Sequence, residues 1–246
     1  MSNITAGQPP VPRVIGQSGI PLIVVGSGSI GNNGALTLTT ALAATPAITN
    51  AYVYLPAGAI AVGVPAAPAW YYAVFSSTTA ATIYNNTYTG GTPAIPASPT
   101  AFATTGPGAY TGSTDIVTAY SLSIPGNTIG INDSVRVSAS FSYTNTASNK
   151  TLALSFGAFA IVSLTNTTTA AQTGIWGFKN AGTTGKQFAT NITSASPLNA
   201  TASALLSGTV DTTAAQTLSW LLTNAVPATN NLVLMNVTVE LVPGAP

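Results

Sequence analysis

Residues 134–144 alternate between apolar and polar side chains, which is the pattern of a β-strand with one buried face. A polar turn at 145–149 leads into a second alternating segment at 151–156. The spacing predicts a β-hairpin built from these two strands. The apolar positions of the first strand are Val135, Val137, Ala139, Phe141 and Tyr143.

The last strand-like segment, 232–242, places Val233, Met235, Val237, Val239 and Leu241 on one predicted face. No stretch combines a 3.6-residue apolar period with a cap and a charged outer face, so no helix is predicted. Short strands separated by Gly, Pro, Asn and Ser predict an all-β protein made of β-sandwich or jelly-roll-like modules. The other predicted strands are 20–25, 35–42, 51–55, 70–75, 116–124, 159–164, 204–210 and 216–222.

Proline and glycine divide the chain into three predicted parts. Residues 1–19 contain Pro9, Pro10 and Pro12, followed by the lone charge of Arg13, and predict an extended N-terminal arm that does not pack. Residues 90–112 have the Pro, Thr, Ala and Gly composition of an extended connector. We therefore predict an N-terminal β module at 20–112, connector included, and in tandem a jelly-roll-like β-sandwich at 113–246.

Charge is nearly absent. The 246 residues contain five Lys or Arg and four Asp or Glu, and none lies between Arg13 and Asp115, whereas soluble domains are typically about 25% charged. A hydrophobic content of 46% argues against disorder, and a net charge of +1 offers no basic surface for nucleic acid. A surface with so little charge is poorly suited to a lone monomer and predicts a homo-oligomer.

Neither export nor membrane insertion is predicted. The first ten residues lack the basic and apolar regions of a secretory signal. Residues 56–75 are charge-free and long enough to span a bilayer, but three prolines and two glycines in this stretch would repeatedly break a helix. Because the chain has no cysteine, disulfides and thiolate metal sites are excluded.

Residues 26–31 read GSGSIG, a literal match to the G-x-G-x-x-G turn of dinucleotide-binding proteins. That turn requires a following helix and an acidic residue about 20 positions later. Here an Asn-Asn-Gly turn and an alternating strand follow, and the first acidic residue is Asp115. The motif is therefore interpreted as a β-turn.

The chain has few groups that could catalyse a reaction. Without His or Cys it can form no Ser-His, Cys-His or His-metal site. A Ser–Lys dyad stays open as an alternative, but no spacing positions one, so we predict a non-enzymatic protein without cofactor or metal. The carboxylates that could form a glycosidase pair are Asp115, Asp133, Asp211 and Glu240.

Aromatic residues gather at 52–54, 70–75 and 176–178. Alternating aromatics usually fill cores and subunit contacts, and we favour that interpretation. The alternative is a sugar-stacking surface, for which Trp70, Tyr72 and Trp176 are the candidate contacts.

Several segments together resemble virion proteins of tailed bacteriophages, the group of tail-fibre tips, head fibres and capsid decoration proteins. The segments are GSGSIGNNGALTL at 26–38, WYYAVFSSTT at 70–79, IYNNTY at 83–88, IPGNTIG at 124–130, and the strands at 135–144 and 150–157. The resemblance spans residues 26–157. It implies a β-rich, usually trimeric structural protein on the particle surface, assembled in the host cytoplasm, and it carries over no catalytic residues.

Two functions follow as alternatives. A capsid decoration or head-fibre protein would dock on the major capsid protein, or on another virion protein, through Pro9, Pro10, Pro12 and Arg13 of the arm. A tail-fibre or receptor-binding protein would recognise a host surface glycan with its C-terminal module. The short arm and the absence of a coiled-coil shaft favour the first.

Overall fold

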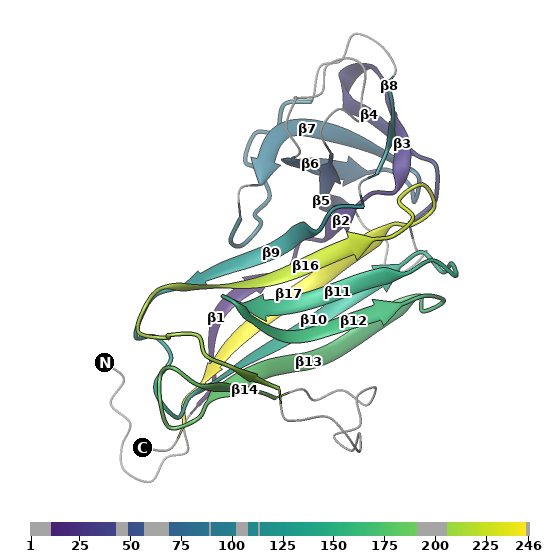
Figure 1. The fold of residues 1–246 in the computed structure, drawn as a ribbon. Helices are drawn as coiled ribbons and strands as arrows, with labels where there is room; N and C mark the ends of the chain where they lie inside the picture. Colours follow the sequence, from purple (N-terminus) through teal and green to yellow (C-terminus); the bar gives the residue numbers. More distant parts are fainter. Residues whose placement is uncertain are drawn as a thin grey trace.

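The computed structural model describes residues 11–42, 49–56, 69–88, 90–101, 108–112, 114–190 and 206–244. Within them the protein is all-β, which confirms the predicted fold class: two sheets and one 3₁₀ turn, with no α-helix. Figure 1 shows an elongated molecule in which a curled sheet sits at one end of a two-layer sandwich. We call strands β2 to β8 the N-terminal region and the remaining strands the sandwich.

The sandwich consists of two sheets packed face to face (Figure 1). One is the four-stranded sheet β12-β11-β16-β9, and the other is the part β15-β14-β13-β10-β17 of a 13-stranded sheet, with β1 added along β17. Its strands are β1 (Arg13–Ser18), β9 (Val117–Ile124), β10 (Ser134–Tyr143), β11 (Lys150–Phe156), β12 (Phe159–Asn166), β13 (Ala171–Asn180), β14 (Gln187–Ala189), β15 (Ser207–Gly208), β16 (Gln216–Asn224) and β17 (Leu232–Val242).

The predicted strand at 134–144 is confirmed as β10, and its five apolar side chains are all buried in the sandwich core. The predicted hairpin between this strand and 151–156 is wrong. β10 pairs with β13 and β17, whereas β11 pairs with β12 and β16 in the opposite sheet. Both strands have an amphipathic pattern and a polar connection, so the sequence looks the same whether the strands pair side by side or face each other across a core.

The predicted single face of β17 is also wrong at its start. Val237, Val239 and Leu241 face the sandwich core as expected, but Val233 and Met235 face a second core. The cause is a β-bulge: Ser140 of β10 pairs with Asn236, and Phe141 pairs with Leu234, which leaves Met235 as the extra residue. One extra residue reverses the side-chain alternation of everything before it.

Arg13–Ser18, predicted to be unpacked arm, form β1 and pair antiparallel with β17. The N-terminal region therefore lies in sequence between the first and second strands of the sandwich, not ahead of it in tandem. β1 is a strand because it pairs with β17, more than 200 residues away in the sequence. The neighbouring prolines give no local sign of this pairing. The predicted boundary at residue 113 falls between β8 and β9.

The sandwich strands follow a regular order in space. One sheet contains the neighbours β1-β17-β10-β13, and the other contains β9-β16-β11-β12. The chain changes sheet at each connection between these eight strands, except between β11 and β12, which form a hairpin.

The N-terminal region continues the large sheet from β17 in the order β2-β5-β6-β7-β4-β3-β8. Its central strands are buried on both faces: Tyr52, Trp70 and Tyr72 belong to the sandwich core, while the alternate residues Val53 and Tyr71 belong to the second core. Burial on both faces explains the nearly continuous apolar runs of these strands. The strands are β2 (Leu22–Val24), β3 (Ser27–Ile30), β4 (Ala35–Leu38), β5 (Asn50–Leu55), β6 (Ala69–Phe75), β7 (Ala80–Tyr88) and β8 (Gly108–Thr111).

Candidate functional site

The three aromatic residues considered for sugar stacking are all buried. Trp70 is 7% exposed, Tyr72 is 3% exposed and Trp176 is 0% exposed. Trp70 and Tyr72 lie on β6, whereas Trp176 packs in the sandwich core with its ring 5.1 Å from that of Trp220. The prediction of a sugar platform at these residues is wrong, because a buried ring cannot stack on a ligand from solvent. The core interpretation of the aromatics is confirmed.

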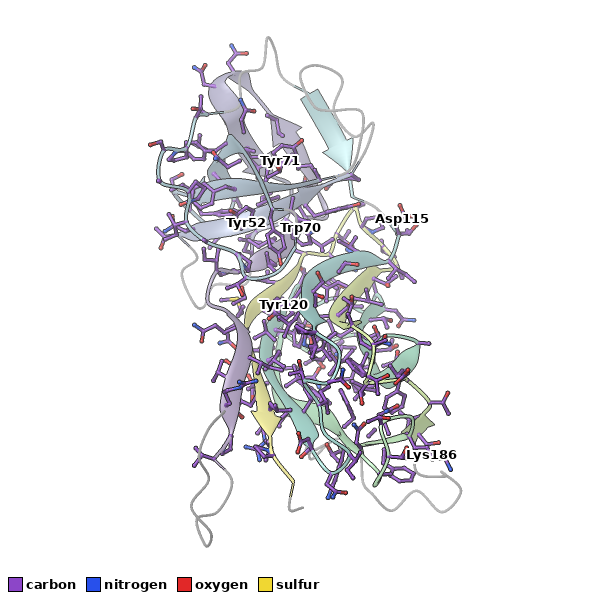
Figure 2. All side chains as sticks on the ribbon, turned by 90° about the vertical axis from the view of Figure 1, so that its left-hand side faces the viewer. Tyr52, Trp70, Tyr71, Asp115, Tyr120 and Lys186 are labelled. Carbon is purple, nitrogen blue, oxygen red and sulfur yellow. The ribbon has the colours of Figure 1, made fainter. Side chains whose placement is uncertain are left out.

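Trp70 and its neighbours instead join the N-terminal region to the sandwich. The indole Nε1 of Trp70 donates a hydrogen bond to the backbone oxygen of Thr118 on β9 over 3.1 Å. Close by, the backbone N–H of Gly91 donates to the oxygen of Ser121, also on β9, over 3.0 Å. Figure 2 shows Trp70 facing the sandwich strand that carries Tyr120. The aromatic cluster is thus a structural junction between the two parts.

Of the proposed attachment residues, Pro9 and Pro10 lie outside the described residues. Pro12 and Arg13 are exposed, and Arg13 opens β1 opposite Leu241 near the end of the chain. Attachment by the arm stays a prediction, restricted to the residues ahead of β1.

Charge is distributed very unevenly along the molecule. The N-terminal region carries none, and the four strands β9, β11, β12 and β16 contain a single charged residue, Lys150. Most of the others gather at the sandwich end farthest from the N-terminal region, where Figure 2 labels Lys186; we call it the charged end. Its members are Arg13, Asp133, Arg136, Lys179, Lys186, Asp211 and Glu240.

The carboxylates at the charged end have structural partners. Asp133 accepts hydrogen bonds from the backbone N–H groups of Gly130 and Gly244, each over 2.8 Å. Asp211 accepts from the backbone N–H and hydroxyl of Thr213, which lowers the pKa of Asp211. Within the described residues no group of three or more acidic side chains is arranged to hold a metal ion.

The carboxylate of Glu240 lies 3.6 Å from the guanidinium of Arg136 on the neighbouring strand β10. Both side chains are partly exposed, at 27% for Glu240 and 43% for Arg136. This ion pair occupies the outer face of the large sheet, so Glu240 also has a structural partner.

Lys150 is the exception to the rule that charge sits at the surface. Its side chain is fully buried at the start of β11, and its ammonium donates to the backbone oxygen and hydroxyl of Thr146, each over 3.1 Å, and to the backbone oxygen of Ser148 over 2.8 Å. Burial lowers the pKa of Lys150. The ammonium thus fixes the loop that connects β10 in the large sheet to β11 in the four-stranded sheet.

The GSGSIG segment forms no cofactor turn. Residues Ser27–Ile30 are strand β3, followed by a short 3₁₀ turn at Asn32–Gly34 and then by strand β4. Asn33 and Gly34 adopt positive φ angles of 57° and 71°, as a tight turn between strands requires. The β-turn interpretation is wrong for this segment, because Ser27–Ile30 pair with β4 and β8 and the turn follows only at Asn32–Gly34. Among the described residues no α-helix follows whose N-terminus could receive a phosphate.

A groove of about 710 Å³ lies on the outer face of the large sheet, where the N-terminal region meets the sandwich. Sequence analysis missed it, because its residues are scattered over most of the chain. The lining comprises Gly19, Ile20, Pro21, Thr49, Asn50, Ile95, Ser140, Phe141, Ser142, Ala171, Thr173, Met235 and Asn236. None of these residues is charged.

Comparison of the chain with protein-family models, with curated proteins and with solved structures finds no significant match. Among the described residues, no helix has the length and apolar character needed to cross a bilayer. The function of this chain is therefore inferred from its own charge distribution and surfaces.

Proposed function

We propose that the protein is a non-enzymatic structural protein on the surface of a tailed-bacteriophage particle, in the role of a capsid decoration or head-fibre protein. The observation that carries the proposal is the distribution of charge: a charge-free N-terminal region and an uncharged sheet face at one side, and a charged end at the other. Uncharged polar surface can be buried between copies without desolvating ions. Such a surface suits an assembled particle better than a free monomer.

The strand order adds support. Eight strands in two sheets, ordered β1-β17-β10-β13 and β9-β16-β11-β12, match a jelly roll, which is built from two Greek keys and recurs in viral capsid proteins and lectins. We infer that the sandwich is a jelly roll with the N-terminal region inserted after its first strand. Fold alone does not assign function, so the charge distribution remains the main argument.

Self-association would use the outer face of β12-β11-β16-β9. All charged side chains are missing from this exposed face, because the one charged residue of the four strands, Lys150, points inward and is buried. Its outward side chains are small and mostly hydroxyl-bearing, such as Thr151, whose hydroxyl lies 3.1 Å from that of Thr165. We propose that copies of the chain, three in the expected trimer, pack through this face.

A charge placed on this face tests the assembly. Leu221→Glu puts a carboxylate at an outward, half-buried position of β16 and is expected to shift the protein from oligomer to monomer in light scattering. Ile175→Glu is the matched control on the outer face of the opposite sheet, and it should leave the oligomer intact. A monomeric wild-type protein at micromolar concentration would contradict the proposal.

Attachment to the particle is assigned to the residues that precede β1. Deleting residues 1–10 should leave a folded oligomer that no longer binds particles lacking the native protein. A deletion through Gln17 is unsuitable, because it removes β1 and exposes the edge of β17. If the shorter deletion still decorates particles at full occupancy, attachment lies elsewhere on the molecule.

The alternative is a tail-fibre or receptor-binding protein that recognises a host surface glycan. The observation that supports this alternative is the uncharged groove. Copy number in purified particles separates the two functions. A number comparable with that of the major capsid protein supports a decoration role, whereas a few copies per particle supports a tail location.

A further inference from the structure

We infer that the groove between the N-terminal region and the sandwich is a binding site for an uncharged oligosaccharide. The site forms where two interruptions of regular strand pairing lie opposite each other. The strand along β17 is interrupted at residues 19–21, between β1 and β2, and the bulge of β17 at Met235 lies opposite this gap. Bulges commonly re-aim side chains next to functional sites, and this one brings Met235 to the same face as its neighbour Asn236, so that both line the groove.

Two carboxamides line the groove with their hydrogen-bonding groups free. The side-chain amides of Asn50, at the start of β5, and of Asn236, on β17, make no hydrogen bond to the described residues. A carboxamide offers two donors and one acceptor, which matches the mixed donor and acceptor character of a sugar hydroxyl. Groups left free in this way can bond to a ligand without breaking bonds within the protein.

Hydroxyl groups of β10 and β13 form the floor between them. The hydroxyl of Thr173 donates to that of Ser140 over 3.1 Å, which orders both groups. Ser142, one pleat farther along β10, is itself nearly buried beneath the groove. The floor thus adds ordered polar groups from rigid strands, the kind of support that makes a site selective.

Apolar contacts come from Ile20, Ile95 and Met235. Ile95 is 59% exposed at the rim, and its loop is tethered by the hydroxyl of Tyr52, which donates to the backbone oxygen of Ala94 over 2.9 Å. Such side chains can cover the C–H face of a sugar ring while the carboxamides bind its hydroxyls. Small-ligand sites usually occupy roughly 300–1,000 Å³, and this groove, in which six of the 13 lining residues have polar side chains, measures about 710 Å³.

The chemistry of the lining selects the ligand class. With no charged residue in the groove, nothing compensates the desolvation of a sialic acid or sulfate group, so neutral sugars are favoured. An added peptide strand is disfavoured at β10 and β5, because both are paired on each side: β10 with β13 and β17, and β5 with β2 and β6. β13 pairs with β14 only at Phe178–Asn180, so peptide binding along residues 171–177 is the competing outcome that the test must separate.

The test uses the full chain on a defined array of neutral, sialylated and sulfated oligosaccharides, followed by calorimetric titration of the neutral glycans that bind. Asn50→Ala and Asn236→Ala should each weaken binding about 3- to 10-fold, the effect of one lost hydrogen bond. Thr173→Trp, which fills the groove, should abolish binding. Asn145→Ala, an exposed asparagine in the loop after β10, is the matched control and should bind like the wild type.

The inference is overturned if no glycan binds, if acidic glycans bind better than neutral ones, or if the two groove variants bind like the control. Capture of peptides in place of glycans by a displayed library would also overturn it. Particle association is measured on the same variants and should be unchanged, so failure here is distinguishable from failure of the proposed virion role.

Discussion

The two parts of the molecule achieve burial in different ways. The sandwich uses long strands, such as the 10 residues of β10 and the 11 of β17, each with one face in the core and one in solvent. The N-terminal region uses shorter strands, such as the 3 residues of β2 and the 6 of β5, whose alternate side chains enter two different cores. Short strands without charged residues can therefore form a stable sheet when both faces of that sheet are buried.

The two parts share one strand. β17 contributes Val237 and Val239 to the sandwich core and Val233 to the second core, and it pairs with β2 at the point of transition. The junction residues Tyr52, Trp70 and Tyr72 add a face of the N-terminal region to the sandwich core. We therefore expect the parts to unfold together.

Cavities in the two cores test this coupling most directly. Phe141→Ala removes a ring whose centre lies 4.9 Å from that of Trp220, and should cost about 3–5 kcal/mol of unfolding free energy. Ile83→Ala, in the second core, should cost about 2–5 kcal/mol. Urea unfolding followed by tryptophan fluorescence and circular dichroism should give one transition for each variant. Two separate transitions would show that the parts are independent.

A glycine substitution tests the close approach of two paired strands in the sandwich. A Cβ at Gly177 of β13 would stand 2.0 Å from the backbone oxygen of Val135, so Gly177→Ala must push two paired strands apart. The expected loss is about 1–3 kcal/mol or more. Gly31→Ala, in the N-terminal region, is the control, since its nearest neighbour would be 3.8 Å away and its φ is −97°. Equal unfolding midpoints would contradict the expectation.

Alkaline pH should weaken the junction. Burial raises the pKa of Tyr52, Tyr72 and Tyr88, and raises that of Tyr120 to about 12 from an ordinary value of 10.0. A raised folded-state pKa means that the unfolded chain loses its protons first, so stability is intact below pH 10 and falls as the pH rises toward 12. Melting temperatures measured between pH 8 and pH 12 should show this decline.

Tyr120→Phe sharpens the alkaline experiment. The Tyr120 hydroxyl has no hydrogen-bond partner within the described residues, so its removal should cost little at neutral pH. Above pH 10 the variant should lose less stability than the wild type, since one fewer buried phenol has to ionise. If the melting temperatures of the two proteins fall in parallel as the pH rises, ionisation of Tyr120 does not contribute to the loss of stability.

The smallest effect is expected at the charged end. Arg136→Ala breaks the exposed ion pair with Glu240 and should cost at most about 1 kcal/mol. Because so few charges are present, the unfolding midpoint and the oligomeric state should change little between low and high salt. A strongly salt-dependent oligomer would show that ion pairs, not the uncharged face, hold the copies together.

Local pattern was sufficient to predict the strands with one clear alternation or a dense apolar run. β10, β16 and β17 lie close to their predicted ranges, and so do β5 and β6. β7 and β13 were missed: β7 contains an Asn-Asn pair, and β13 contains two glycines, all of which are common in turns. In both strands the pairing with neighbours on each side outweighs the weak local preference.

By itself the sequence determined the all-β class and the lack of charge, because these depend on composition and on neighbours a few residues apart. Only the tertiary structure decided that β1 joins β17, that β10 and β11 face each other across a core, and that Trp70, Tyr72 and Trp176 are buried. It alone placed Asn50 in the same groove as the bulged residue Met235 and its neighbour Asn236. The physical reason is that strand pairing and burial are settled by contacts between residues far apart in the chain, which alternation along one strand does not encode.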